Sequence, residues 1–342
     1  MNYPKPLRSG STIAVTAFSA GIEKQHRARF DLVKTHLESL RFRVVLGNCL
    51  HGQVKHVSAP LEERVDELMK FLLDDSIDAI FPPWGGEFAM ELLPHIDFAK
   101  LQSVRPKWVL GFSDVSTLAA TFTSKLGSAS AHCSNFMDLT PEALDPLTAN
   151  TLTHIGTPTG ETFSQQASAM FASEWPDIAN EPASSFNLDT ESSWKWLVKP
   201  SSGNELRGRL IGGCWDTLHH LFNTEYLDLE TLSENSPEGI ILYLENAEMS
   251  PTDIVRTVLS MQFKGVFKHI SGLLLGRNSA PDPSHKEALT YYEAIEQTLV
   301  DCGVPVMYDL DIGHQPPNLT LINGALAKIE LDHVGTISQQ LV

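Results

Sequence analysis

The chain has 342 residues, of which 42% are hydrophobic and 20% are charged, so it can bury a sizeable core and form two domains rather than remain disordered. Its formal net charge of −17 repels phosphate backbones and therefore disfavours a nucleic-acid partner. The N-terminal sequence lacks the apolar core of a signal peptide, and no run approaches the roughly 20 apolar residues of a membrane span, so we expect a cytoplasmic protein without a membrane partner.

The four cysteines are spread widely along the chain, and none forms a Cys-x-x-Cys pair or a Cys/His metal spacing. This distribution favours reduced thiols in a reducing compartment. We expect no metal site and no organic cofactor.

Residues 1–155 alternate short apolar runs with amphipathic helical patterns. Ser58 and Pro60, for example, are start signals for a helix with an apolar stripe. Buried strands are expected at 12–17, 42–46, 78–83 and 107–112. The alternation predicts an α/β domain with a parallel sheet, in which functional residues gather at the carboxyl ends of the strands.

Residues 156–205 are rich in Ser, Thr, Pro, Asn and Glu, and their apolar periodicity is weak. We interpret them as an interdomain connection with a long loop insertion, and loops of this length are often functional. Trp175, Trp194 and Trp196 are unusual in such a segment. These rings either anchor the loop to the body of the protein or stack on a planar group of a ligand.

Residues 206–342 predict a second domain that mixes strands and helices. Ser250 precedes a proline and an apolar helical stripe, which is typical of a helix N-terminus. Further expected elements are strands at 239–245 and 271–276 and a helix near 286–301. Asn323 and Gly324 stand between two alternating runs, a pattern that predicts a β-hairpin with a type I′ turn.

Ser113 follows a buried apolar run in KWVLGFSDVSTL and precedes a helical pattern. A strand-to-helix turn presents a serine at the edge of a sheet, beside the positive end of the helix. A helix N-cap is the simpler interpretation of such a serine. Gly85 and Gly86 have a similar setting, where they permit a tight turn, close approach of a ligand, and backbone N–H groups that bind an oxyanion.

A serine hydroxyl needs a base, and the base needs an orienting acid. Among the thirteen histidines, His314 is distinctive because it follows a glycine in a loop that leads into a strand. Glu245 ends the apolar run GIILYLE, where an acid is unexpected unless it has a task. Taken alone, Glu245 also fits a capping or salt-bridge role.

Five segments together resemble the family of L,D-carboxypeptidases and microcin-immunity peptidases. In chain order they are PWGGEFAMELL, LGFSDVSTL, RLIGGCWDTLHHLFNTEY, ILYLENAEMSP and DIGHQPPNLTLINGA. The N-terminal PLRSGSTIAV also resembles the family's opening segment, so that the resemblance runs from about residue 4 to residue 330. Each segment alone is weak evidence for the family, but five segments in the expected order are specific to it.

The resemblance implies a serine hydrolase with a Ser-Glu-His triad. Ser113 would be the nucleophile, Glu245 the orienting acid and His314 the general base. The backbone N–H groups of Gly86 and Asp114 would form the oxyanion hole. The family pairs an N-terminal nucleophile domain with a C-terminal mixed α/β domain that carries the Glu and His, and its members are usually homodimers.

Two branches of the family differ in substrate, and the long insertion favours the microcin-immunity branch, which cuts the amide joining a peptide or amino acid to a nucleotide. In that interpretation Trp194 and Trp196 stack on a nucleobase, Gly85 lies against the substrate, and Arg277 contacts a carboxylate or phosphate. A plain salt bridge is an equal alternative for Arg277. The small peptide or peptidyl-nucleotide substrate would be the partner, and no cofactor is implied.

Two alternatives remain open at this point. One is an L,D-carboxypeptidase that removes a terminal D-alanine from murein tetrapeptides, and the other is a catalytically inactive relative that binds a small ligand. The sequence also departs from the family pattern at Glu87, Cys214 and Asn246. These departures affect the shape of the pocket but not the triad.

Overall fold

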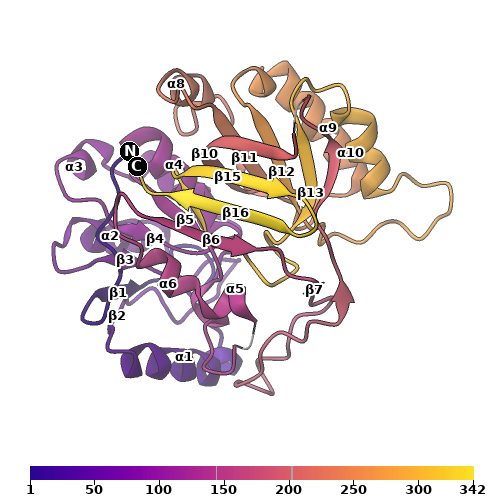
Figure 1. The fold of residues 1–342 in the computed structure, drawn as a ribbon. Helices are drawn as coiled ribbons and strands as arrows, with labels where there is room; N and C mark the ends of the chain where they lie inside the picture. Colours follow the sequence, from indigo (N-terminus) through magenta and orange to yellow (C-terminus); the bar gives the residue numbers. More distant parts are fainter. Residues whose placement is uncertain (144, 202) are drawn as a thin grey trace.

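The computed structural model describes residues 1–143, 145–201 and 203–342, and within these ranges the strands form a four-stranded sheet, an eight-stranded sheet and two short pairs. Figure 1 shows the N-terminal half below and to the left of the larger C-terminal sheet, with the two termini side by side. The Tyr3 hydroxyl donates a hydrogen bond to the carbonyl of Val342 at 3.0 Å. No helix in the described ranges is long and apolar enough to cross a membrane.

The N-terminal sheet is parallel throughout, as the alternating pattern predicts, and its order is β2-β1-β3-β4. Its strands are β1 (Thr12–Val15), β2 (Arg43–Leu46), β3 (Ala79–Ile80) and β4 (Trp108–Val109). The helices of this half are α1 (Arg27–Ser39), α2 (Leu61–Leu73), α3 (Phe98–Gln102), α4 (Val115–Leu126), α5 (Pro146–Ala149) and α6 (Thr151–Ile155), with 3-10 turns η1 (Lys24–His26), η2 (Ala89–His95) and η3 (Phe136–Asp138).

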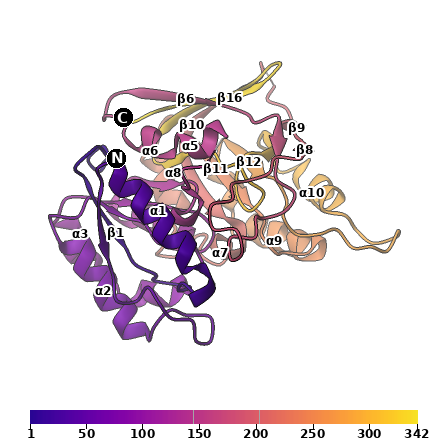
Figure 2. The ribbon, with the colours of Figure 1, turned by 90° about the horizontal axis from the view of Figure 1, so that it is seen from below.

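The two faces of the N-terminal sheet are covered by different helices. Successive side chains of a strand point to opposite faces. In β1, Ile13 packs into the same cluster as Phe30 of α1, whereas Ala14 packs with Leu68 of α2. Figure 2 accordingly shows α1 and α2 on either side of β1.

Helix α4 joins the two halves of the molecule. Every residue from Val115 to Thr123 is buried. Leu118 belongs to one continuous apolar cluster that also contains Leu68 of the N-terminal half and Leu242 of the C-terminal half. The amide of Cys214 donates to the Ser116 hydroxyl at 2.9 Å, which fixes the end of a C-terminal strand against the start of α4.

The C-terminal sheet has the order β6-β16-β15-β10-β11-β12-β13-β9, with parallel pairing from β10 to β13 and antiparallel pairing outside them. Its strands in the C-terminal half are β10 (Glu205–Cys214), β11 (Ile240–Glu245), β12 (Gly272–Gly276), β13 (Val306–Leu310), β15 (Leu326–Leu331) and β16 (Gly335–Gln340). The helices are α7 (Trp215–Leu218), α8 (Leu229–Glu234), α9 (Pro251–Phe263) and α10 (Tyr291–Leu299), with the 3-10 turn η4 (Val266–Lys268). As expected, the Ser250 side chain caps α9 and Pro251 is its first residue.

The connecting segment is more structured than the sequence indicates. It contains β6 (Thr162–Gln166), β7 (Met170–Phe171), β8 (Thr190–Glu191) and β9 (Lys195–Val198). Strand β6 pairs with β16 at one edge of the C-terminal sheet, and β9 pairs with β13 at the other edge. Only Phe163 and Gln165 of β6 are buried, so this edge strand has too few apolar residues to produce a clear periodicity.

The predicted hairpin at Asn323 and Gly324 is wrong. The strand before the turn, β14 (Leu321–Asn323), pairs with β5 (Ser130–His132) of the N-terminal half, whereas β15 pairs with β10 and β16. Asn323 is fully buried, and its side-chain oxygen accepts hydrogen bonds from the Gly212 amide and the Tyr243 hydroxyl. These tertiary contacts, rather than the local turn preference, determine where the chain goes.

Two buried glutamines satisfy the backbone of the segment that enters β14. Gln165 of β6 accepts from the Thr320 amide and donates to the Thr320 carbonyl, both at 2.9 Å. Gln339 of β16 accepts from the Ile322 amide at 2.8 Å and donates to the same Thr320 carbonyl. Side-chain amides thus replace the neighbouring strand that this stretch of backbone lacks.

Candidate active site

Ser113 lies on the turn between β4 and α4, where the sequence predicts it. Its backbone φ is 61°, in the left-handed region that non-glycine residues seldom occupy. Gly85 packs directly against this turn, because a Cβ atom at Gly85 would lie 2.8 Å from the Ser113 Oγ and 2.7 Å from the Asp114 nitrogen. The glycine therefore lets the two strand-end loops approach each other closely.

Ser113, His314 and Glu245 form a hydrogen-bonded chain. The Ser113 Oγ lies 3.1 Å from the His314 Nε2, and the His314 Nδ1 lies 2.8 Å from the Glu245 Oε2. Glu245 ends β11, and His314 stands in the loop after β13. Gly313 has a φ of 101°, and a Cβ atom there would collide with the Glu245 carboxylate. The three side chains thus come together from both halves of the molecule.

The surroundings of the imidazole favour its charged form. Burial lowers the pKa of His314, but the charge and hydrogen bond of Glu245, together with Asp216 and Glu248, outweigh burial and raise the pKa above its ordinary value. Glu245 itself is 1% exposed. Cys214 packs beside it, and burial together with the charge of Glu245 raises the pKa of that thiol well above its usual range. Cys214 therefore stays a neutral thiol, which is a poor nucleophile.

The amides of Gly86 and Asp114 have no hydrogen-bond partner among the residues that the structure describes. The buried Asp114 carboxylate holds the surrounding loops, since it accepts from the Ser19 hydroxyl at 2.6 Å and from the Ala89 amide at 2.7 Å. Burial raises the pKa of Asp114, although these hydrogen bonds act against the rise. The arrangement suits a rigid pair of backbone donors next to Ser113.

A cavity of about 390 Å³ opens beside the triad, and most of its wall is apolar. Its lining includes Ser113, His314, Gly85 and Gly86, together with the aromatic residues Trp84, Phe112, Trp175 and Phe186. Residues 172–189, which we call the roof, cover it from the connecting segment. The Trp175 ring stacks on Phe112, with ring centroids 6.3 Å apart, and its Nε1 donates to the His314 carbonyl at 3.0 Å.

Two charged residues of this cavity, Arg29 and Asp138, escaped the sequence analysis. Arg29 stands on the buried face of α1, four residues before Val33 and eight before Leu37. A charged residue in register with an apolar helical stripe is a signal that the sequence contains. Asp138 ends the short turn η3, which has no periodicity from which its burial could be read.

Three expected substrate contacts lie elsewhere and do not line the triad cavity. Trp194 is 4% exposed, and its Nε1 donates to Asp311 at 2.8 Å, so the ring is an anchor of the segment rather than a free stacking surface. Trp196 stands on the edge strand β9. The aromatic side chain that does reach the triad cavity from this segment and contacts the His314 loop is Trp175.

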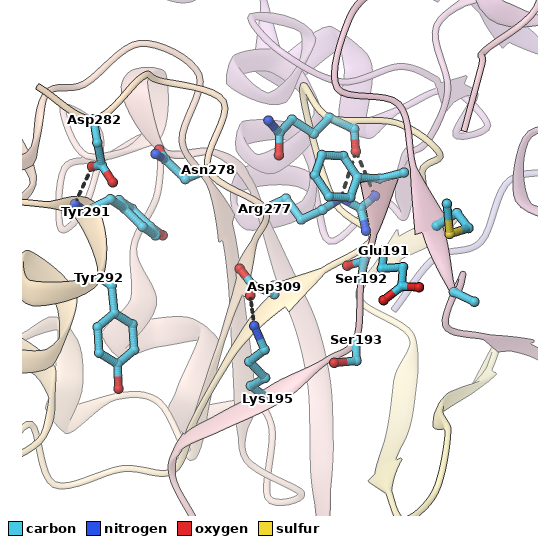
Figure 3. A pocket seen from close by; sticks show the side chains of 14 residues that line it. Glu191, Ser192, Ser193, Lys195, Arg277, Asn278, Asp282, Tyr291, Tyr292 and Asp309 are labelled. Carbon is cyan, nitrogen blue, oxygen red and sulfur yellow. Dashed lines mark hydrogen bonds and ion pairs between the residues drawn. The ribbon is translucent and has the colours of Figure 1, made fainter. Parts of the chain in front are cut away.

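Arg277 lines a separate, larger cavity of about 710 Å³, which neither Ser113 nor His314 lines (Figure 3). The Arg277 Nη1 forms an ion pair with the buried Asp311 at 2.7 Å, and its Nε and Nη2 donate to backbone carbonyls of the loop after His314. Its guanidinium is therefore already used to hold that loop. Within the described ranges, no group of three or more His, Cys, Asp or Glu side chains is placed to hold a metal ion.

Comparison with known proteins gives matches to both halves. Residues 13–133 match the LD-carboxypeptidase N-terminal domain, and residues 207–329 match the LD-carboxypeptidase C-terminal domain. A putative carboxypeptidase of Vibrio cholerae is 26% identical, with 97% of this chain and 96% of that protein covered. The microcin C7 self-immunity protein MccF of Escherichia coli is 25% identical, with 96% and 93% covered. A probable murein peptide carboxypeptidase of Bacillus subtilis is 24% identical, with 96% and 91% covered.

Solved structures share the two-domain fold. The structure of MccF in complex with glutamyl sulfamoyl guanosine has a TM-score of 0.83, 23% identity, and 98% of each chain covered. MccF in complex with aspartyl sulfamoyl adenosine gives the same TM-score and the same coverage at 23% identity. An MccF-like protein from Streptococcus pneumoniae, in complex with AMP, has a TM-score of 0.79 at 25% identity, with 97% of this chain and 99% of that chain covered.

Proposed function

Because the chain belongs to the LD-carboxypeptidase family, we propose that it is a serine hydrolase that cleaves an amide bond near a C-terminus through an acyl-enzyme, with Ser113 as nucleophile, His314 as general base and Glu245 as orienting acid. The observation that carries the proposal is the hydrogen-bonded chain of these three side chains, beside two backbone amides that have no partner among the described residues.

The chemistry follows from the geometry. The neutral imidazole of His314 takes the Ser113 proton as Oγ attacks the carbonyl carbon, and Glu245 stabilises the imidazolium that forms. The amides of Gly86 and Asp114 donate to the oxyanion, and one such donor is worth about 3 kcal/mol in related enzymes. His314 then gives its proton to the leaving amine and activates the water that hydrolyses the acyl-enzyme.

Labelling with a fluorophosphonate tests the triad and separates an enzyme from an inactive binding protein. We expect stoichiometric labelling of the wild type, mapped to Ser113 by mass spectrometry, and no labelling of Ser113→Ala. Ser116→Ala is a poor control because the Ser116 hydroxyl accepts a hydrogen bond from the Cys214 amide. Ser103→Ala, on an exposed turn, is the matched control. Labelling that persists in Ser113→Ala would reject the assignment.

For the substrate we favour an aminoacyl or peptidyl nucleotide, as in the MccF branch. The support is the aromatic wall of the cavity, since Phe112, Trp175 and Phe186 offer the faces on which a nucleobase stacks. The MccF structures hold glutamyl sulfamoyl guanosine and aspartyl sulfamoyl adenosine. The alternative is removal of D-alanine from murein tetrapeptides, which the near full-length match to the murein peptide carboxypeptidase favours.

A paired assay decides between these substrates. Hydrolysis of aspartyl sulfamoyl adenosine and of a murein tetrapeptide is measured on the same preparation, and we expect the larger kcat/KM for the nucleotide analogue. Trp175→Ala should raise KM for the nucleotide analogue roughly tenfold by removing a stacking face. A larger kcat/KM for the murein peptide would place the chain in the other branch.

A further inference from the structure

The apolar cavity beside Ser113 contains two buried charged side chains. Arg29 comes from α1 and Asp138 from η3, and both line the cavity together with Ser113 and His314. Arg29 is 2% exposed and Asp138 is 8% exposed. Burying charged groups in an apolar wall is costly unless each finds a partner. Their partners in the protein account for only part of their hydrogen-bonding capacity.

The guanidinium of Arg29 is held from one side and free on the other. Its Nε donates to the Met137 carbonyl at 2.7 Å, and its Nη1 donates to the carbonyls of Pro182 and Ser184 in the roof at 2.9 and 2.5 Å. Its Nη2 has no hydrogen-bond partner among the described residues. The side chain is therefore fixed in position and has a donor nitrogen left for a ligand.

Asp138 likewise uses only one of its two carboxylate oxygens within the described ranges. Its Oδ2 accepts from the Asn135 amide at 2.8 Å, and its Oδ1 has no partner in the part of the chain that the structure describes. The hydrogen bonds of Arg29 and Asp138 within the described ranges do not join the two side chains, although the charge of Arg29 lowers the pKa of Asp138. The two side chains are thus near each other but not joined, and burial raises the pKa of Asp138 to about 7, so that its carboxyl ionises near neutral pH.

We propose that Arg29 and Asp138 bind a zwitterionic acyl group of the substrate, with Arg29 Nη2 donating to its carboxylate and Asp138 Oδ1 accepting from its ammonium. The assignment rests on the proposed function, because Arg29 and Asp138 line the same cavity as Ser113. In this arrangement the acyl group lies at Arg29 and Asp138 and the leaving group at Phe112 and Trp175, with the scissile carbonyl at Ser113 between them. A charged pair that stays unjoined matches a ligand group carrying both charges a few bonds apart.

Two sources present this chemistry. An aspartyl or glutamyl nucleotide carries an α-ammonium and a side-chain carboxylate on its acyl residue. A murein tetrapeptide with a diamino diacid carries a free ammonium and carboxylate at the end of the side chain before its terminal D-alanine. The recognition chemistry is the same, so the two are separated by which substrate series the enzyme hydrolyses.

The test combines enzyme variants with substrates that lack one charge. In the nucleotide series, aspartyl sulfamoyl adenosine is compared with the asparaginyl form, which lacks the carboxylate, and the 3-carboxypropionyl form, which lacks the ammonium. In the murein series, a tetrapeptide with a diamino diacid is compared with one that has lysine, which lacks the carboxylate, and one that has 2-aminopimelate, which lacks the ammonium. We expect the wild type to prefer the zwitterionic substrate of one series in kcat/KM by roughly 10- to 100-fold.

The variants are Asp138→Asn, which keeps an acceptor for the Asn135 amide, and Arg29→Lys. Asp138→Asn should abolish the preference for the ammonium and keep that for the carboxylate, and Arg29→Lys should do the reverse. Glu181→Gln, an exposed acid of the roof, is the matched control and should keep both preferences. If the two residues have only a structural role, kcat/KM should instead fall equally for all substrates, and the ratios between substrates should stay unchanged.

Competition against fluorophosphonate labelling measures binding at Arg29 and Asp138 without requiring hydrolysis of a substrate. Free aspartate and the free diamino diacid are added as competitors, and at least one should slow the labelling of the wild type but not of Asp138→Asn. Absence of labelling in the wild type rejects the proposed function. Labelling that neither competitor slows, or unchanged preference ratios in both variants, rejects only the assignment of Arg29 and Asp138.

Discussion

At Ser113 the backbone adopts a left-handed conformation that a residue with a Cβ atom seldom takes, and such strain persists only where the surroundings impose it. The sequence draws attention to Ser113 through the buried run and helix on either side, to Glu245 as an acid that ends an apolar run, and to His314 as a histidine that follows a glycine. The order of the family segments then joins the three. It could not locate Trp194 or Arg277, because the partner of both, Asp311, is distant in sequence. Side-chain burial of that kind is decided by tertiary contacts.

Glu245→Gln tests the electrostatics of the imidazole. Glu245 raises the pKa of His314 against the effect of burial, and the reaction needs neutral imidazole, so the wild-type rate rises with pH through this pKa. Removing the charge lowers the pKa of His314, and the acid limb of the pH profile of fluorophosphonate labelling should move to lower pH. The rate at neutral pH should fall about 10³- to 10⁴-fold.

The control for that variant is Glu248→Gln. Glu248 is exposed and also raises the pKa of His314, as the least of its contributors. This control should move the acid limb only slightly and leave the rate near that of the wild type. An acid limb that stays in place in Glu245→Gln would contradict the role of the carboxylate.

Asp138→Asn should stabilise the protein in a pH-dependent way. Burial raises the pKa of Asp138 to about 7, although Arg29 and His314 lower it, with Asp145 acting in the same direction as burial. The folded state therefore keeps a proton that the unfolded chain releases above about pH 4, so stability falls as pH rises from about 4 to 7.

The asparagine variant has no proton to lose at this position. Its free energy of unfolding should match that of the wild type near pH 4 and exceed it by about 4 kcal/mol at pH 8, where the whole penalty of ionising the buried carboxyl is present. Chemical denaturation at the two pH values measures the difference. An equal gain in the free energy of unfolding at both pH values would show that packing, not ionisation, is responsible.

Among the elements, the sequence predicts β1 to β4 in the N-terminal half and β11 and β12 in the C-terminal half, because each lies in a distinct apolar run. It does not name the other two parallel strands of the C-terminal half, β10 and β13. It misses β6 and β9, which lie at the two edges of the C-terminal sheet and bury little apolar surface. It also assigns β14 to a hairpin, whereas the strand pairs with β5. In both cases pairing partners far along the chain override a local signal.

Gln165→Leu tests how β6 supports the backbone of β14. The change removes the acceptor of the Thr320 amide in a buried environment, and an orphaned buried donor costs about 1–3 kcal/mol. We expect the free energy of unfolding to drop by that amount. Gln166→Leu, on the exposed face of the same strand, should change it by less than about 0.5 kcal/mol. Equal effects of the two would refute the support role of Gln165.

In the whole molecule, the two domains expected from the sequence share one core. The cluster that contains Leu68 and Leu242 runs through α4, and β5 and β14 pair across the halves. Composition and periodicity indicate two α/β regions, but they cannot reveal that the apolar faces meet. The proposed active site lies where they meet, with Ser113 from one half and Glu245 and His314 from the other.

A shared core predicts a single cooperative unfolding transition. Separating the halves would expose Leu118 and the rest of α4 to water. Each Å² of apolar surface exposed in this way costs about 25 cal/mol of free energy. Calorimetry should therefore give one transition, and residues 1–155 expressed alone should lack a cooperative one. Two well-resolved transitions would mean that the halves fold independently.

The roof is fastened at both ends, since β6 before it and β9 after it are strands of the same sheet. A protease cut within residues 172–189 would thus divide the covalent chain without dividing the particle. The first fragment would stay paired through β5 with β14 and through β6 with β16. On a gel with denaturant the nicked protein would run as two pieces, while on a native sizing column it would elute as one. Ser113 of the first piece would stay beside Glu245 and His314 of the second.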